Sequence, residues 1–185
     1  MRKLSLAELG RMNTEEHKKA RKIPVVVVLD NVRSQHNIGS IFRTADAFRL
    51  KAVYLCGISA TPPNREMNKT ALGATESVDW KYFENTKDAL LELKKKNFNV
   101  CAIEQTDGSI PLSNFDFNSF DGLGIVFGNE VDGVSQEIVD FADTCIEIPQ
   151  YGTKHSLNVA VSAGIIIWDV FNKFITYNPG YLSDN

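Results

Sequence analysis

The chain has 185 residues, of which 43% are hydrophobic and 23% charged, and its formal net charge is −3. This composition is typical of a soluble domain with a buried core and argues against a disordered or low-complexity protein. The first 22 residues lack the apolar stretch of a secretory signal, so a cytoplasmic protein is expected. The most apolar stretch, 157–171, contains Asn158, Ser162 and Asp169 and is shorter than the ~20 residues of a membrane span, so no membrane contact is expected.

Charged residues are unevenly distributed along the chain. Residues 1–103 hold 18 Lys and Arg against 11 Asp and Glu, whereas residues 104–147 hold ten Asp and Glu and no Lys or Arg. A basic first part can face a polyanion, with the acidic segment turned away, although ordinary solvated surface explains the imbalance equally well. Charge therefore permits a nucleic-acid partner without requiring one.

The three cysteines lie in separate apolar runs and form no Cys-x-x-Cys pair: Cys56, Cys101 and Cys145. This pattern favours buried thiols over a disulfide framework or a zinc site, and no metal is expected.

Strand-like and helical patterns alternate through the chain. The chain begins with a predicted charged helix over 1–22, with Ser5 or Thr14 as possible caps. Strands are expected at 25–30, 52–57, 77–83 (a weaker pattern), 99–105, 123–129 and 144–149. Helices are expected between and after them at 38–48, 86–96, 135–142 (capped by Ser135) and 156–175. The strands are short and apolar on both faces, which indicates a parallel sheet covered by helices. The sequence therefore predicts one α/β domain over 23–175, with a mostly parallel sheet flanked by helices, and a tail over 176–185.

The last predicted helix is apolar almost all round. Such a helix must be covered on more than one side. Burial within the subunit and contact with a partner subunit explain this pattern about equally well.

Three polar blocks each follow a predicted strand, at the edge where open α/β sheets bind ligands. The first block, 30–40, leads into a helix that Asn37 can cap, and Arg43 lies about 1.7 turns further on. In the second block, Gly128 lets a ligand approach the backbone and Glu130 offers a carboxylate. In the third block, 148–158, Ser156 is near the predicted cap and Asn158 is in the first turn. Taken singly, each block is more simply a capped helix or a turn, but all three together favour a site.

Other enzyme classes match poorly. The chain has no phosphate-binding GxxxxGK[ST] loop and no GxSxG elbow, and its three histidines lack metal-ligand spacing. Glycines at 122 and 124 precede or lie within a strand, so they do not form a dinucleotide-binding turn.

Taken in order, the three blocks resemble the motifs of the SpoU (TrmH-like) RNA 2′-O-ribose methyltransferases of the SPOUT superfamily. The first block resembles motif one through Asn37-x-Gly39-x3-Arg43. The second resembles motif two through Gly128-Asn129-Glu130, and the third resembles motif three through Ile148-Pro149 and Ser156-Leu157-Asn158. The likeness covers roughly residues 24–172, and the ordered set is far more specific than any one motif.

This resemblance implies transfer of a methyl group from S-adenosylmethionine to a ribose 2′-hydroxyl in RNA. It implies a C-terminal trefoil knot that holds the cofactor, and a homodimer with its sites near the subunit interface. The matching cofactor-binding positions are Gly128, Ile148, Ser156 and Leu157. The matching catalytic positions are Arg43, Asn37, Glu130, Ser156 and Asn158.

The family assigns activation of the hydroxyl to the arginine that Arg43 matches. Because a guanidinium stays protonated at neutral pH, we expect Arg43 mainly to stabilise the developing alkoxide and to anchor a neighbouring phosphate.

The RNA substrate is less well defined. Ribosomal-RNA members of the family often carry an extra N-terminal RNA-binding domain, and this chain has no room for one, which favours tRNA over rRNA. Candidate phosphate contacts are Arg33, Arg65, Lys69 and Lys154, although each is also ordinary surface charge. The alternatives are a methyltransferase acting on a base nitrogen, a non-catalytic RNA-binding protein on the same fold, and an unrelated α/β small-molecule binder.

Overall fold

The computed structural model describes residues 1–5, 7–117 and 121–183, and it places seven strands in one sheet. The strands are β1 (Ile23–Asp30), β2 (Leu50–Cys56), β3 (Trp80–Phe83), β4 (Asn99–Ile103), β5 (Ile110–Pro111), β6 (Leu123–Phe127) and β7 (Thr144–Glu147). Their order is β3-β2-β1-β6-β4-β7-β5, and neighbouring strands are parallel throughout. The expected mostly parallel sheet is confirmed, and the carboxyl ends of its strands share one edge.

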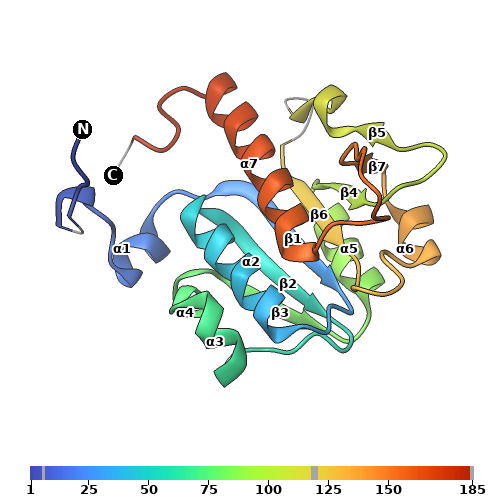
Figure 1. The fold of residues 1–185 in the computed structure, drawn as a ribbon, viewed down its shortest axis with the longest axis horizontal. Coiled ribbons are helices and arrows are strands. Elements are labelled where there is room, and N and C mark those ends of the chain that lie inside the picture. The colour runs from blue at the N-terminus through green and yellow to red at the C-terminus, as the bar shows by residue number, and fades with distance from the viewer. Residues whose placement is uncertain (6, 118–120, 184–185) are drawn as a thin grey trace.

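Helices cover both faces of the sheet (Figure 1). They are α1 (Thr14–Lys19), α2 (Gln35–Ala47), α3 (Arg65–Ala71), α4 (Ala74–Ser77), α5 (Thr86–Lys95), α6 (Gln136–Phe141) and α7 (Val159–Tyr177). Helices α2, α3, α4 and α7 bury residues on one face, and α5 and α6 on the other.

The central strand β1 explains why the strands are apolar on both faces. Val25, Val27 and Leu29 pack toward α2 and α7, whereas Val26 and Val28 pack toward α5 and α6. A strand between two helical layers has no solvent-facing side, so the alternation of polar and apolar residues disappears.

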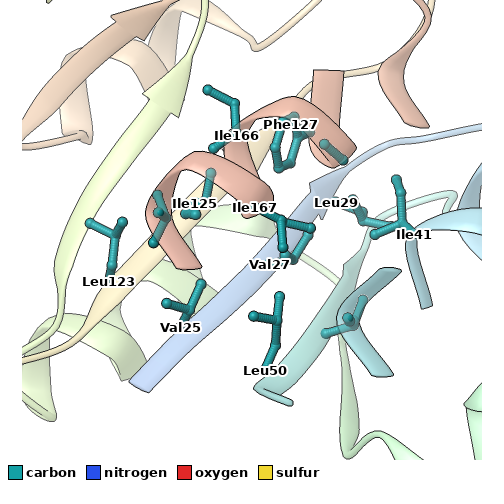
Figure 2. Packing of buried hydrophobic residues seen from close by; sticks show 14 of the residues in the cluster. Val25, Val27, Leu29, Ile41, Leu50, Leu123, Ile125, Phe127, Ile166 and Ile167 are labelled. Atoms are coloured by element: carbon teal, nitrogen blue, oxygen red, sulfur yellow. The ribbon is translucent and has the colours of Figure 1, made fainter. Parts of the chain in front are cut away.

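Helix α7 lies across the central strands, and Ile166 and Ile167 are inserted between it and the sheet (Figure 2). By length and composition α7 could cross a membrane. Its inward residues are buried in the sheet's core, however, as in the core helix of a globular domain: Ala163, Ile166, Ile167, Val170 and Phe174. An apolar stripe of Val161, Ile165 and Trp168 remains 38–54% exposed on the outer side.

The N-terminal segment differs from the expected single helix. It forms a 3₁₀ turn over Ala7–Leu9 and the six-residue helix α1, separated by Gly10 with φ 56°. Neither Ser5 nor Thr14 caps α1. Asn13 does, because its side chain accepts from the amide of Glu16 while the Glu16 carboxylate accepts from the amide of Asn13.

The C-terminal segment packs back onto the N-terminal one. Tyr181 donates to the carbonyl of Lys22 (3.2 Å), and its ring lies 3.7 Å from the guanidinium carbon of Arg21.

Several other element boundaries differ from the sequence prediction. Helices α3 and α4 and strand β5 were not predicted, because they are short and show no clear periodicity. The strand predicted over 99–105 ends at Ile103, where Glu104 turns to accept from the amide of Val134. The strand predicted over 77–83 is β3, which begins at Trp80. Ser135 does stand at the N-cap of α6, without a side-chain hydrogen bond.

All three cysteines are free thiols; Cys56 and Cys101 are buried, whereas Cys145 is half-buried. Burial raises the pKa of the Cys56 and Cys101 thiols to about 12. In the folded protein we therefore expect iodoacetamide to label these two at least about 100-fold more slowly than in urea. Mass spectrometry of digested samples would measure the rates. Labelling of Cys145 should be the fastest of the three, and rapid native labelling of Cys56 would contradict this assignment.

Candidate functional site

A cavity of about 490 Å³ lies at the carboxyl ends of β4, β6 and β7. The loops that follow these three strands form its wall, and its size suits a small-molecule ligand. Six of the residues that the sequence singled out line it: Gly128, Glu130, Ile148, Ser156, Leu157 and Asn158.

A chain of polar side chains connects the three sequence blocks. Asn158 donates through Nδ2 to Oδ1 of Asn37 (3.2 Å), and Asn37 donates through Nδ2 to Oε1 of Glu130 (2.9 Å). The amides of Arg33 and Ser34 also donate to Glu130, each at 3.1 Å. Residues up to 121 positions apart in the sequence thus meet in one network, which fixes the orientation of both asparagine amides.

The pKa of Glu130 is lowered from its usual value. Burial by itself raises it, but the hydrogen bonds from Asn37 and from the backbone amides of Arg33, Glu130 and Ser34 outweigh burial. Glu130 is therefore anionic at neutral pH.

This shift predicts a pH-dependent contribution of Glu130 to stability. Because the pKa is lower in the folded state, the contribution is present above the unfolded-state pKa and is lost as the pH falls through the folded-state value. Glu130→Gln should destabilise the protein at neutral pH, and the difference from wild type should shrink on acidification. Urea unfolding of both proteins from neutral to acidic pH measures this. A difference independent of pH would show that charge plays no part.

Two expected helix caps are assigned differently in the structure. Ser34 caps α2, accepting from the amide of Asn37, so the Asn37 side chain is available for the network. Asn158, not Ser156, caps α7, accepting from the amides of Ala160 and Val161. The prediction that Asn37 caps its helix was wrong because the helix begins three residues earlier than the apolar periodicity indicated.

The structure gives a reason for glycine at position 128 that the sequence did not indicate. A Cβ atom there would lie 1.9 Å from the carbonyl carbon of Gly133 and 2.1 Å from the amide nitrogen of Val134. The segment that approaches its Cα is therefore the chain's own turn, and this contact gives the cavity wall its shape.

Two candidates do not line this cavity: Asn37, which is hydrogen-bonded to two residues that do, and Arg43, which has no contact with it. Arg43 lies about 9 Å further along α2 than Asn37, is exposed, and has no hydrogen-bond or ion-pair partner among the described residues. Arg43 lines a second cavity at the C-terminal part of α2.

The first cavity is acidic. Four of the ten acidic residues of the segment 104–147 line it: Glu104, Glu130, Asp132 and Glu147. The sequence pattern did not indicate that acidic residues of this segment other than Glu130 would line a ligand-sized cavity. Glu104 was missed, although it follows a strand directly, as the other site residues do. It accepts from the amide of Val134 (3.0 Å) and so positions the turn against Gly128.

The candidate phosphate contacts remain scattered. Arg33, Arg65 and Lys154 are exposed, while Lys69 is paired with Glu66 at 2.7 Å. Within 1–5, 7–117 and 121–183, no group of three His, Cys, Asp or Glu side chains is arranged to hold a metal ion.

A parallel sheet with a ligand-sized cavity across three neighbouring carboxyl-end loops is the arrangement of an α/β enzyme that binds a small-molecule cofactor. The model of the SpoU rRNA Methylase family matches residues 24–168, and the chain belongs to this family.

Its relatives include RNA methyltransferases. The tRNA (guanosine(18)-2′-O)-methyltransferase of Aquifex aeolicus is 37% identical over 153 residues, which cover 80% of this chain and 69% of that protein. The crystal structure of the A. aeolicus TrmH/SpoU tRNA modifying enzyme superposes with a TM-score of 0.78 at 31% identity, covering 92% of this chain and 83% of that one. An S-adenosylmethionine-bound rRNA methyltransferase from Sinorhizobium meliloti gives a TM-score of 0.75 at 28% identity, covering 86% of this chain and 59% of that one.

Proposed function

We propose that this protein transfers a methyl group from S-adenosylmethionine to a ribose 2′-hydroxyl in RNA. The observation that carries the proposal is the network Asn158–Asn37–Glu130 beside a cavity lined by Gly128, Ile148, Ser156 and Leu157. Relatives named as RNA 2′-O-methyltransferases support the reaction class.

The residues of the first cavity suit S-adenosylmethionine. Its volume of about 490 Å³ is in the range of small-molecule sites, and its carboxylates favour a ligand with positive charge on sulfur and nitrogen. We assign cofactor binding to Gly128, Ile148, Ser156 and Leu157. When bound, the cofactor supplies an electrophilic methyl group, so the protein need only orient the nucleophile and favour loss of its proton.

The chain's own residues perform those two tasks. The fixed amides of Asn37 and Asn158 hold the ribose. Anionic Glu130 orients the amide of Asn37, which in turn accepts from the amide of Asn158. Ser156 precedes the Asn158 cap at the cavity wall. Arg43 would stabilise the 2′-oxygen as its proton leaves to water and the methyl group passes to it from the cofactor's sulfur, which is left as a neutral thioether.

Arg43 can act there only if a second copy of the chain is present. We propose a homodimer that buries the exposed stripe of α7, formed by Val161, Ile165 and Trp168 at helical spacings of four and three. The stripe starts beside the cavity, since Asn158, Val159 and Ser162 line it. A two-fold axis near this stripe would bring Arg43 of one subunit toward the cavity of its partner.

Three further features belong to the proposal. We infer a methyltransferase domain over 23–175, flanked by the extension 1–22 and the tail 176–185, and we place the protein in the cytoplasm. We also infer that the segment after β7 is threaded as a trefoil knot. In support, this segment lines the cavity together with the loops after β4 and β6, and Gln105 donates to the carbonyl of His155 across them (3.0 Å).

We propose tRNA in preference to rRNA as the substrate. The A. aeolicus relative that is 37% identical to this chain is named for a tRNA nucleoside.

Incubation with radiolabelled S-adenosylmethionine and separate pools of tRNA and rRNA lacking 2′-O-methyl marks tests the function. Digestion to nucleosides should release label on a 2′-O-methylnucleoside, predominantly from tRNA. Label on a methylated base would favour the base-methylating alternative. RNA and cofactor binding without transfer to either pool would favour a non-catalytic RNA-binding protein, and failure to bind the cofactor would contradict the proposal.

A further inference from the structure

The second cavity, of about 650 Å³, lies between the N-terminal segment and helices α2 and α4. It shares no lining residue with the first cavity. Three arginines line it: Arg11, Arg43 and Arg49. The N-terminal segment 9–14 forms one wall, so the extension outside the family match completes this cavity.

Arg49 combines two unfavourable features. Its backbone is left-handed, with φ 50°, a conformation that long side chains rarely adopt. Its Nη1 atom is buried and has no acceptor within the part of the chain that the structure describes. The left-handed backbone follows from the position of Arg49 directly after the C-cap of α2, where helices commonly end in this conformation. The unsatisfied buried donor is the feature that a bound acceptor would explain.

Two carboxylates, of Asp46 and Glu76, line the cavity together with the arginines. No ion pair joins Arg49 to a carboxylate among the described residues. Asp46 accepts from the Ser77 hydroxyl and lies 3.4 Å from Nε2 of His17. Burial lowers the pKa of the neighbouring Lys22; Asp46 and Asp79 oppose this shift, and the charge of Arg49 adds to it. The cation Arg49 is therefore close to the cation Lys22, and an anionic ligand would reduce the repulsion between them.

We propose that this cavity binds a phosphodiester group of the RNA substrate, with Arg49 as the main contact and Arg11 at the rim. A guanidinium is always charged and presents paired N–H donors that match phosphate oxygens. Arg43, to which we assign the reacting 2′-oxygen, lines the same cavity, so a phosphate held there belongs to the RNA close to the target ribose. The inference rests on the proposed function and gives the N-terminal segment a role in holding substrate.

The test measures RNA affinity as a function of salt for wild type, Arg49→Asn and Arg11→Gln, with a pool of tRNA transcripts made in vitro as the probe. Asparagine tolerates the left-handed backbone, so this variant removes the guanidinium without adding strain. Arg49→Asn should bind RNA roughly tenfold more weakly, and its slope of log affinity against log salt should be shallower by about 0.7–0.9. Its melting temperature without RNA should stay the same or rise, because strain and an unsatisfied donor are removed. Arg11→Gln should show a smaller change of the same kind.

The matched control is Lys95→Gln, which removes one exposed positive charge from α5 on the opposite face of the sheet. The slope of its log affinity against log salt should equal that of wild type.

A lower melting temperature for Arg49→Asn with an unchanged slope would show a structural role and overturn the proposal. Stabilisation of wild type by inorganic phosphate at constant ionic strength, with RNA binding insensitive to Arg49→Asn, would indicate a small-anion site and also overturn it. If wild type transfers methyl groups and Arg49→Asn has the same salt slope as wild type, only this inference fails. If wild type binds no RNA, the proposed function fails as well.

Discussion

Replacing Arg43 with alanine is expected to lower the turnover number for methyl transfer about 100- to 1,000-fold, with the melting temperature unchanged. The loss should be large because a fixed positive group beside the developing alkoxide acts in the transition state. The fold should be unaffected because the Arg43 side chain is exposed and has no partner among the described residues. Single-turnover rates with saturating cofactor measure the effect.

Arg43→Lys separates charge from geometry. If the forked guanidinium is needed, the lysine variant should remain at least about tenfold slower than wild type. Near-full turnover with lysine would show that a positive charge alone suffices and would contradict a bidentate role.

Mixed dimers test whether Arg43 serves the partner's cavity. Subunits carrying Arg43→Ala and subunits carrying Glu130→Gln should each be nearly inactive. Mixed and re-annealed, they should recover up to about a quarter of wild-type activity, since half of the dimers then contain one intact composite site out of two. No recovery would place Arg43 and Glu130 in the same subunit's site.

Gly128→Ala is expected to have the second large effect, a loss of about 3 kcal/mol of stability together with loss of cofactor binding. The added methyl group would overlap the backbone of Gly133 and Val134, which cannot move aside as a flexible side chain can. The turn that includes Glu130 would therefore be displaced. Urea unfolding and calorimetric titration with S-adenosylmethionine measure the two losses.

Gly152→Ala is the control, because a Cβ atom at that position meets no heavy atom within 4 Å. Its stability should stay within about 0.5 kcal/mol of wild type. If Gly128→Ala were equally neutral, the close approach of the 133–134 turn would not hold in solution.

The sheet and its site loops were predictable from the sequence because local patterns encode them. Runs such as 25–29 and 123–127 contain no polar side chain, as is typical of a strand that is covered on both faces. The polar blocks after those strands had to meet at one edge, because parallel strands end on the same side. The three motifs are also specific enough to indicate the family, which the match over residues 24–168 shows.

The residues at which helices begin were less predictable from the sequence, because they depend on which of several neighbouring side chains caps the helix. Ser34 and Asn37 are both good capping residues, and only the tertiary contact of Asn37 with Glu130 explains which of them caps α2. The same applies to Ser156 and Asn158 at the start of α7.

The sequence by itself determined the α/β architecture, the order of the strand and helix patterns, and the identity of the polar blocks, because periodicity and motif spacing are local properties. Only the tertiary structure decided that Asn37, Glu130 and Asn158 form one hydrogen-bonded chain, that acidic residues line the first cavity, and that Arg43 lies with Arg49 in another. Those features depend on contacts between residues far apart in the chain. Their geometry is set by how α2, α7 and the loops pack on the sheet.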